Sequence, residues 1–222
     1  SRKEYAAVLR LGFVTDTQDV TGEALECRPV TSTLQTLEAA LEGFRGEIQQ
    51  IPPMYSAVKV DGQRLYDLAR KGKTVERKPR PVTIYELELL GQESETDFRL
   101  RCVCSKGTYI RTLCHDIGQT LGCGGVMCAL RRTMAAGFTL ADAVTIEDVQ
   151  TQGEALLRPV DSLFAAYPAR TVRSAGQEKR VRCGNPVTLP GTPDGTCRLY
   201  GQDGAFLCLS KAENGLLTAI KN

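Results

Sequence analysis

The 222-residue sequence predicts an α+β protein with a small β-rich domain at its C-terminal end. In some segments apolar residues alternate, which is typical of strands, and in others they recur every three or four residues, which is typical of helices. After about residue 164, Gly and Pro become frequent and separate short apolar segments, which indicates tight turns between strands. We therefore expect a first domain of residues 1–165 and a second of residues 166–222.

The N-terminal region begins with a strand over residues 3–13, in which alternate residues share one face. The residues on that face are Tyr5, Ala7, Leu9 and Leu11. A polar turn follows at 15–22. Ser32 then opens a helix with Gln35 three residues on, which is the capping-box pattern. The helix presents one apolar stripe, made of Leu34, Leu37, Leu41 and Phe44.

The middle of the chain alternates between strands and helices. In chain order we expect a short strand and an Asp-Gly turn in 51–62, a short helix at 64–71, antiparallel strands at 81–90 and 97–105, a glycine turn and helix in 105–122, an extended segment at 128–140, and a helix from Thr145 to about Leu157. The C-terminal strands are expected in 180–189, 197–201, 205–212 and 216–222. A hairpin turn at 202–204 joins two of these strands.

Charge is distributed unevenly along the chain. The net charge is only +2, which excludes a polycation, but segment 59–80 carries +5 and segment 170–182 carries +4, against −5 over 14–47. A solvated helix face explains one basic run as well as a ligand does. Two basic patches, one with Tyr55 and Tyr66 nearby, favour a surface that binds a phosphate backbone.

The cysteines do not indicate a metal site. The nine Cys have irregular spacing without a C-x-x-C pair, and His115 is the single histidine, so the paired ligands of a zinc site are missing. Reduced thiols in a cytoplasmic protein are the simpler interpretation. No signal peptide or membrane-spanning segment is recognisable. We expect no metal, no cofactor and no membrane partner.

Two short stretches carry residues suited to chemistry. Tyr5 precedes a Leu-Gly pair and an acidic turn with Asp16 and Asp19, and residues 105–111 form a glycine turn that leads into a helix with Tyr109 and Arg111 in its first turn. Backbone N–H groups are free at such a helix start. A phenol can contact a base, and an arginine can hold a carboxylate in a fixed geometry. Taken alone, these residues are explained better by a structural cap and by turn-forming aspartates.

Taken together, the order of these segments resembles the TruB-type tRNA pseudouridine synthases. The matching stretches are KEYAAVLRLG (3–12), TDTQDVTG (15–22), QIPPMYSAVKVDGQRLYDLARKG (50–72), RPVTIYEL (80–87), CSKGTYIRTL (104–113), LRRTMAAGF (130–138), AVTIEDV (143–149) and CGNPV (183–187). The resemblance implies the pseudouridine-synthase fold, with a mostly antiparallel mixed sheet that is partial here, and a PUA-like RNA-binding domain. It also implies isomerisation of uridine 55 in the T-arm of tRNA, without cofactor or metal, by an enzyme that is a monomer when full-length.

The resemblance assigns roles to residues that match the family's motifs. Tyr5 is similar to the stacking and catalytic tyrosine, and Arg111 to the arginine that orients the nucleophilic Asp. Tyr109 resembles the residue that hydrogen-bonds in the pocket and contacts the flipped base. Leu130 resembles the apolar wall of the substrate pocket, and Asp19 resembles an acidic residue near the cleft. Segment 59–80 resembles the loop that closes over the T-arm. Its expected RNA-binding residues are Lys59, Arg64, Arg70, Lys71 and Lys73.

One feature departs from the family. The family's nucleophilic Asp lies in a G-x-L-D-P-like motif upstream of the strand with Tyr5, and this chain has no Asp-Pro pair. We expect the chain to be an N-terminally truncated fragment that is inactive alone. Two alternatives stay open. One is a non-catalytic RNA-binding protein on the same fold, and the other is a small hydrolase that uses Asp16 or Asp19.

Overall fold

The computed structural model describes residues 2–221 and divides into two compact units, Ser1–Ala143 (unit 1) and Val144–Asn222 (unit 2). Each unit has its own buried apolar core. Segment 144–165, which the sequence assigns to the first domain, makes its contacts within unit 2. The predicted strand at 216–222 includes Asn222, which lies outside the described residues.

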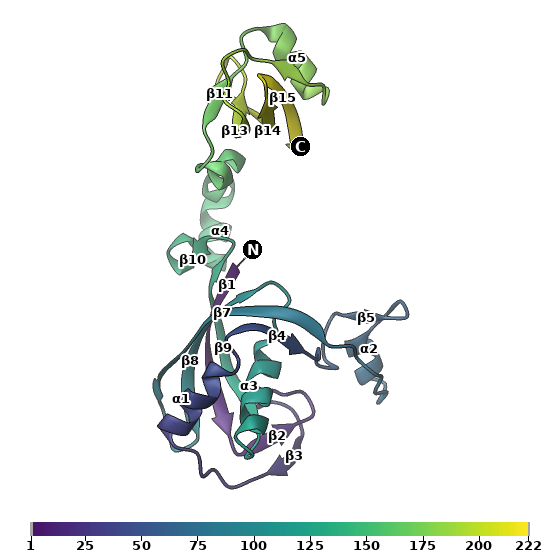
Figure 1. Ribbon diagram of the computed structural model, residues 1–222, viewed down its shortest axis with the longest axis vertical. Helices are drawn as coiled ribbons and strands as arrows, with labels where there is room; N and C mark the ends of the chain where they lie inside the picture. Colours follow the sequence, from purple (N-terminus) through teal and green to yellow (C-terminus); the bar gives the residue numbers. More distant parts are fainter. Residues whose placement is uncertain (1, 222) are drawn as a thin grey trace. The chain divides into compact units, whose positions relative to one another are not determined.

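Unit 1 is built on a six-stranded sheet with the order β10-β9-β1-β8-β7-β4 (Figure 1). Its strands are β1 (Arg2–Leu11), β4 (Gly46–Gln50), β7 (Arg80–Gln92), β8 (Asp97–Ser105), β9 (Gly125–Ala135) and β10 (Phe138–Thr139). Every neighbouring pair in this sheet is antiparallel. The predicted extended segment 128–140 is interrupted, because Ala136 and Gly137 adopt positive φ and turn the chain back from β9 into β10.

The core of unit 1 lies between one face of the sheet and two helices, α1 (Leu34–Glu42) and α3 (Ile110–Thr120). The predicted face of β1 is confirmed, because Ala7, Leu9 and Leu11 are buried and Tyr5 packs beside them. Helix α3 crosses β9 closely. A Cβ on Gly118 would come within 2.1 Å of the Gly125 backbone, so only glycine allows this approach.

Helix α1 begins one residue later than predicted. Thr33 is the N-cap and forms a capping box with Thr36, so the proposed pair of Ser32 and Gln35 is wrong. Both Ser32 and Thr33 are good caps by residue type, and the local pattern does not separate them. The strand β4 and the hairpin of β2 (Phe13–Thr15) and β3 (Ala24–Cys27) were not predicted, since they are short and weakly alternating.

Between β4 and β7 the chain forms a small insertion, residues 51–79. It contains the hairpin β5 (Lys59–Val60) and β6 (Gln63–Arg64), followed by α2 (Leu65–Ala69). Asp61 and Gly62 have φ of 50° and 79°, as the predicted Asp-Gly turn requires. The insertion has its own small cluster of buried residues, made of Met54, Leu65 and Leu68.

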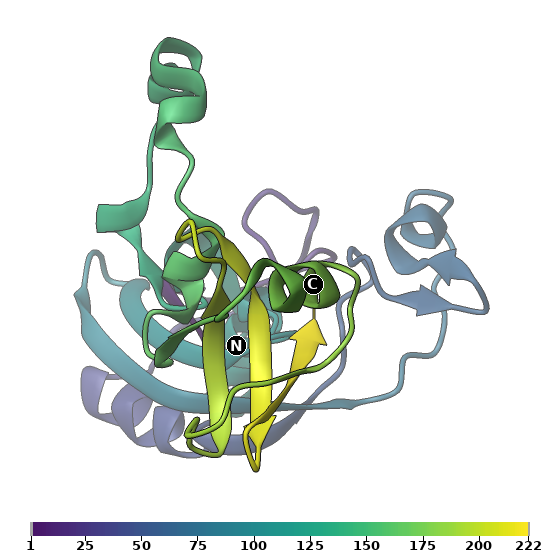
Figure 2. The same ribbon diagram turned by 90° about the horizontal axis from the view of Figure 1, so that it is seen from above.

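Unit 2 contains a five-stranded sheet with the order β11-β13-β14-β15-β12. The elements are α4 (Ile146–Gln152), β11 (Ala169–Thr171), α5 (Ala175–Arg182), β12 (Val187–Thr188), β13 (Gly195–Tyr200), β14 (Phe206–Glu213) and β15 (Leu216–Lys221), with short 3-10 helices at Gly153–Leu156 and Val160–Phe164. In Figure 2 the strands β13 to β15, green to yellow, lie side by side. The β-rich prediction is confirmed, except that part of the expected strand at 180–189 belongs to α5.

The helix α5 was missed because its pattern is weak. Ser174 caps it by accepting a hydrogen bond from the Gln177 N–H, and Val181 is its single buried residue. Helix α4 also ends earlier than predicted, since Gly153 adopts a positive φ of 54° and a 3-10 turn follows. Across residues 2–221, no helix combines the length and apolar character that crossing a membrane requires.

Candidate functional site

The first turn of α3 carries two of the predicted site residues, Tyr109 and Arg111. Gly107, with φ of 90°, turns the chain from β8 into the helix, and Tyr109 is the N-cap. The Tyr109 side chain makes no cap hydrogen bond. Instead, the side-chain amide of Gln50 holds the Tyr109 main chain. Its Oε1 accepts from the Tyr109 N–H at 3.0 Å, and its Nε2 donates to the Tyr109 carbonyl at 3.3 Å.

Arg111 is tied to the start of the insertion. Its Nη2 donates to the carbonyl oxygen of Tyr55 at 2.8 Å. Among residues 2–221, no carboxylate forms an ion pair or hydrogen bond with Arg111. A guanidinium has five N–H donors in a planar fork, so donors remain for a second acceptor. The arginine is therefore positioned by a neutral carbonyl.

Tyr5 lies on β1 opposite Cys102 on β8 and Arg132 on β9. It is half-buried against the core cluster that also contains Ile110, the residue between Tyr109 and Arg111. Burial raises the pKa of the Tyr5 phenol, so the group is protonated at neutral pH. A half-buried, neutral aromatic ring is suited to stacking on a base.

Leu130 is placed on β9 beside Tyr5. Its register partner on β1 is Ala7, two residues from Tyr5, so both side chains belong to the same face of the sheet. Leu130 is 44% exposed and lies where β9 forms the edge of the sheet, since β10 pairs only with Met134 and Ala135. An exposed leucine next to a half-buried tyrosine forms an apolar surface that is open to a ligand.

Asp19 lies in the loop between β2 and β3, and this loop is fixed to the rest of unit 1. Asp19 forms an isolated bridge with Met127 of β9, and Gln18 accepts a hydrogen bond from the Thr112 hydroxyl at 2.9 Å. The Asp19 carboxylate accepts bonds from the N–H and hydroxyl of Thr21 at 3.0 and 2.7 Å. Asp16 likewise accepts a bond from the Glu23 N–H at 2.8 Å. Both carboxylates thus act as turn-forming groups in this structure.

A cavity of about 390 Å³ opens next to the first turn of α3. It is lined by Gln18, Gln49, Ile51, Arg77, Thr112, His115 and Asp116. Burial raises the pKa of Asp116 to about 6, and burial together with the charge of Arg28 lowers the pKa of His115. Neither Asp116 nor the lining of this cavity is predictable from sequence patterns, because the lining residues come from four separate segments.

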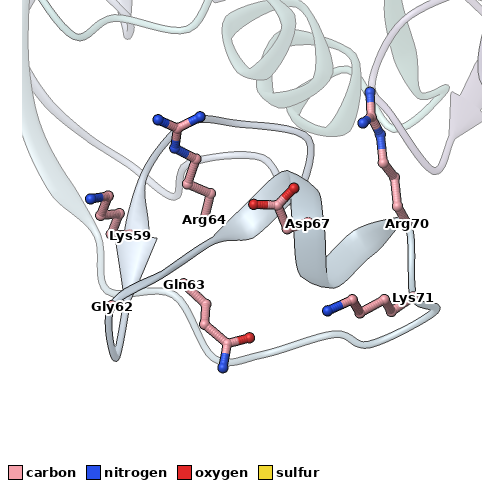
Figure 3. A pocket seen from close by; sticks show the side chains of 7 residues that line it. All are labelled: Lys59, Gly62, Gln63, Arg64, Asp67, Arg70 and Lys71. Carbon is pink, nitrogen blue, oxygen red and sulfur yellow. The ribbon is translucent and has the colours of Figure 1, made fainter.

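The basic residues of the insertion surround a second, open cavity of about 590 Å³ (Figure 3). Four of the five predicted RNA-binding residues line it, namely Lys59, Arg64, Arg70 and Lys71. We call these four residues the basic cradle. Arg64 and Arg70 also lie within 5.7 and 5.5 Å of the Tyr66 ring centre. Lys73 follows α2 and does not line the cavity. The cradle combines positive charge with an aromatic ring, as nucleic-acid surfaces do.

The second basic patch lies in unit 2, on and before α5. Lys179, Arg180 and Arg182 are in the last turns of this helix, and the Arg182 guanidinium pairs with Glu178.

The nine cysteines and one histidine raise the question of a metal site. Within the described range 2–221, no group of three or more His, Cys, Asp or Glu side chains is arranged to hold a metal ion.

Family models match all of unit 1 and the first part of unit 2. The model "TruB family pseudouridylate synthase (N terminal domain)" matches residues 1–110, and the model "tRNA pseudouridylate synthase B C-terminal domain" matches residues 111–165.

Curated relatives agree with these models. The chain is 46% identical to tRNA pseudouridine synthase B of Stutzerimonas stutzeri over 223 residues, which covers 96% of this chain and 72% of the relative. It is 47% identical to the protein of the same name from Pseudomonas syringae pv. syringae over 225 residues, with 97% and 73% covered.

Among solved structures, the chain is similar to one in "Crystal Structure of a Cbf5-Nop10-Gar1 Complex". The TM-score is 0.62 at 23% identity, with 96% of this chain and 60% of that chain covered. A second match, in "Crystal structure of the archaeal box H/ACA sRNP Nop10-Cbf5 complex", has a TM-score of 0.56 at 20% identity. The chain spans about three fifths of the length of these solved chains. At this identity the likeness concerns the fold.

Proposed function

The chain belongs to the TruB family of tRNA pseudouridine synthases, which are isomerases, and on this premise we propose that it serves the conversion of uridine 55 to pseudouridine in the T-arm of tRNA. The reaction breaks the bond between ribose C1′ and uracil N1, turns the base, and forms a bond between C1′ and C5. The C5 proton is lost and N1 gains a proton, so the overall change is an isomerisation. The single observation that carries the proposal is the placement of Tyr109 and Arg111 at the start of α3, with Tyr5 packed against the core cluster that also contains Ile110.

Each residue has a role that its surroundings support. The target base must leave the helical stack, which costs a few kcal/mol. The ring of Tyr5 and the exposed Leu130 offer an apolar surface that recovers part of this cost. Tyr109 offers a phenol for a base edge. Arg111 has donors left for a carboxylate nucleophile, because its bond to Tyr55 uses only part of the guanidinium.

The basic cradle and the patch on α5 are proposed to bind the phosphate backbone of the tRNA. Phosphate contacts supply affinity and are salt-dependent, whereas base contacts supply specificity. Because tRNA is the substrate, we place the enzyme in the cytoplasm. We also propose that the whole enzyme acts as a monomer, since Tyr5, Tyr109 and Arg111 all come from one unit of one chain.

Residues 1–222 by themselves are proposed to bind the T-arm without isomerising its uridine. The supporting observation is that Arg111 has no carboxylate partner among residues 2–221, and that both candidate aspartates, Asp16 and Asp19, are engaged in their own turns. The alternative, a non-catalytic RNA-binding protein on the same fold, is favoured by the same observation. The two differ in whether a carboxylate supplied next to Arg111 starts catalysis.

The test measures binding and chemistry separately. Fluorescence anisotropy with a labelled T-arm stem-loop is expected to detect binding by residues 1–222, and tritium release from C5-labelled tRNA is expected to be absent. Adding, ahead of residue 1, the family segment with the Asp-Pro motif should start tritium release. Absence of RNA binding at low salt would contradict the substrate. Tritium release by residues 1–222 alone would show that another carboxylate is the nucleophile. Continued inactivity of the extended protein would favour the non-catalytic alternative.

A further inference from the structure

Gln50 is the last residue of β4 and is only 1% exposed. It stands immediately before the insertion, and its register partner Arg80 is the first residue of β7 after the insertion. Gln50 is therefore the point from which the insertion leaves the sheet. A buried polar side chain is costly unless its amide groups are bonded.

Both halves of the Gln50 amide are bonded to one residue, Tyr109. Oε1 accepts from the Tyr109 N–H at 3.0 Å and Nε2 donates to the Tyr109 carbonyl at 3.3 Å. That carbonyl also accepts the first helical bond, from the Leu113 N–H at 3.0 Å. Two contacts from a planar amide restrict both the position and the orientation of the Tyr109 peptide groups, which a single bond does not.

We propose that Gln50 is a positioning residue for the reaction, which sets the first turn of α3, with Tyr109 and Arg111, relative to the base of the insertion. A second contact acts in the same place, because Arg111 donates to the carbonyl of Tyr55 within the insertion. Three hydrogen bonds, two from Gln50 and one from Arg111, thus hold the first turn of α3 against the base of the insertion. We call these three bonds the clamp. The catalytic meaning of this clamp rests on the proposed function, whereas its geometry does not.

The first experiment measures the clamp without RNA. Amide hydrogen exchange by NMR is expected to show the Tyr109 N–H protected in the wild-type chain. In Gln50→Leu, which has a side chain of similar size without hydrogen-bonding atoms, exchange at Tyr109 should be about tenfold faster, as loss of a buried hydrogen bond predicts. Leu37→Val, in the core under α1, is the control for a general loss of stability, and it should leave the ratio between Tyr109 and other α3 amides unchanged.

A second variant provides rescue by pH. In Gln50→Glu the neutral carboxylic acid has one acceptor oxygen and one O–H donor, so it can replace the amide. The carboxylate cannot donate to the Tyr109 carbonyl, and its negative charge repels that oxygen, which pushes the side chain away from the Tyr109 peptide groups. Burial raises the pKa of such a carboxyl group. Protection of the Tyr109 amide, measured relative to wild type at each pH, should therefore approach the wild-type value near pH 5 and fall at pH 8.

The third measurement connects the clamp with the RNA. A T-arm stem-loop with 2-aminopurine beside the target uridine reports unstacking of the base through its fluorescence. With Gln50→Leu, we expect the fluorescence increase at saturation to fall about fivefold, while the Kd rises less than about threefold, because the basic cradle still binds phosphate. A residue that merely stabilised the fold would change both values together, as in Leu37→Val.

The outcomes separate the inference from the proposed function. Unchanged exchange at Tyr109 in Gln50→Leu, or a Gln50→Glu profile without pH dependence, would overturn the clamp. An equal change in Kd and fluorescence would overturn the positioning role. If the wild-type chain fails to bind the stem-loop, the proposed function is contradicted, and the exchange measurements still decide on the clamp.

Discussion

The two long helices of unit 1 begin in different ways. Helix α1 is capped by its own sequence, since Thr33 and Thr36 exchange side-chain and backbone hydrogen bonds three residues apart. The N-cap of α3, Tyr109, has no side-chain cap. The first turn of α3 is held instead by Gln50, Tyr55 and Gln18, which lie 59, 56 and 94 residues from their partners.

The two helix starts serve different purposes. A local cap stabilises a helix wherever the helix lies. Bonds from three distant segments fix the first turn of α3 relative to the edge strand β4, the insertion, and the loop between β2 and β3. The price of that arrangement is several buried polar groups that must all be satisfied at once. We infer that the start of α1 is purely structural and that the start of α3 is built to place its side chains.

The strongest way to test the comparison is Arg111→Lys in the protein that carries the family's Asp-Pro segment. A lysine keeps the charge but loses the planar fork that can bond Tyr55 and a carboxylate together. We expect turnover to fall by about 100-fold, the loss typical of an electrostatic group at a reacting centre. The Kd for the T-arm should change less than about threefold. Tritium release and anisotropy measure the two quantities.

The outcome that would break the comparison is an equal loss of turnover and binding, because Arg111 would then act as a phosphate contact. Arg45→Lys near the end of α1 is a matched control. Arg45 also donates to a backbone carbonyl, that of Leu87, but it lies away from the start of α3. It should leave turnover within about twofold of wild type, as expected for a surface change.

Local features of the fold could be predicted from the sequence. The alternation in β1 correctly gave the buried face, and the Asp61-Gly62 turn and the glycine turn and helix in 105–122 followed from short-range patterns. These patterns work because neighbouring residues on one element determine the outcome. The cap of α1 was missed by one residue, since Ser32 and Thr33 are equally good by type.

The site could be predicted only in part. The roles of Tyr5, Tyr109 and Arg111 are assigned only through resemblance to the family and stay predictions, since no pattern in the chain itself links the three residues. Gln50 and Asp116 were missed, because their importance comes from contacts across the fold rather than from sequence spacing. A buried glutamine leaves no periodic signal at the end of a five-residue strand.

The basic cradle belongs to the insertion, which is bonded to the start of α3 through Tyr55 and through Gln50 immediately before it. We expect the triple variant Arg64→Gln, Arg70→Gln, Lys71→Gln to raise the Kd for the T-arm by on the order of tenfold and to lower the slope of log Kd against log salt by about 2. The wild-type chain and the variant are compared by anisotropy over a salt series. All three residues are exposed, so the melting temperature should stay nearly constant.

A cation outside the predicted surface provides the control. Lys211 pairs with Glu213 on β14 in unit 2, and Lys211→Gln should leave the salt slope within about 0.3 of wild type. If the triple variant also binds like wild type, the cradle is a solvated surface. The contacts to RNA would then have to come from elsewhere, such as the patch on α5.

A smaller effect is expected from Asp116, which lies further along α3 in the wall of the 390 Å³ cavity. Burial raises its pKa from an ordinary value of 3.8 to about 6, so the folded state binds this proton more tightly than the unfolded state. The cost to stability therefore develops as the pH rises from about 4 to 6 and is complete above that range. Asp116→Asn should increase the free energy of unfolding at pH 7.5 by about 1 kcal/mol, after allowance for partial exposure.

Urea denaturation at pH 5 and pH 7.5 measures this effect. Asp97→Asn is a control of opposite sign, because the hydrogen bonds from Arg10 lower the pKa of Asp97 and its contribution to stability is present at neutral pH and lost as the pH falls. A stability difference for Asp116→Asn that is the same at both pH values would show that the carboxyl group does not titrate in this range.

The smallest effect concerns the local cap of α1 and tests the other side of the comparison. Thr33→Ala removes the hydroxyl that accepts from the Thr36 N–H, so it should lower the free energy of unfolding by about 0.5 kcal/mol, at the lower end of the range for caps. Ser32→Ala, one residue earlier and outside the capping box, should have almost no effect. Because the cap of α1 is local, neither variant should change T-arm binding or the exchange rate of the Tyr109 amide. If Thr33→Ala did alter the Tyr109 amide, the two helix starts would be coupled through the core that they share, and the distinction between a structural and a positioning helix start would fail.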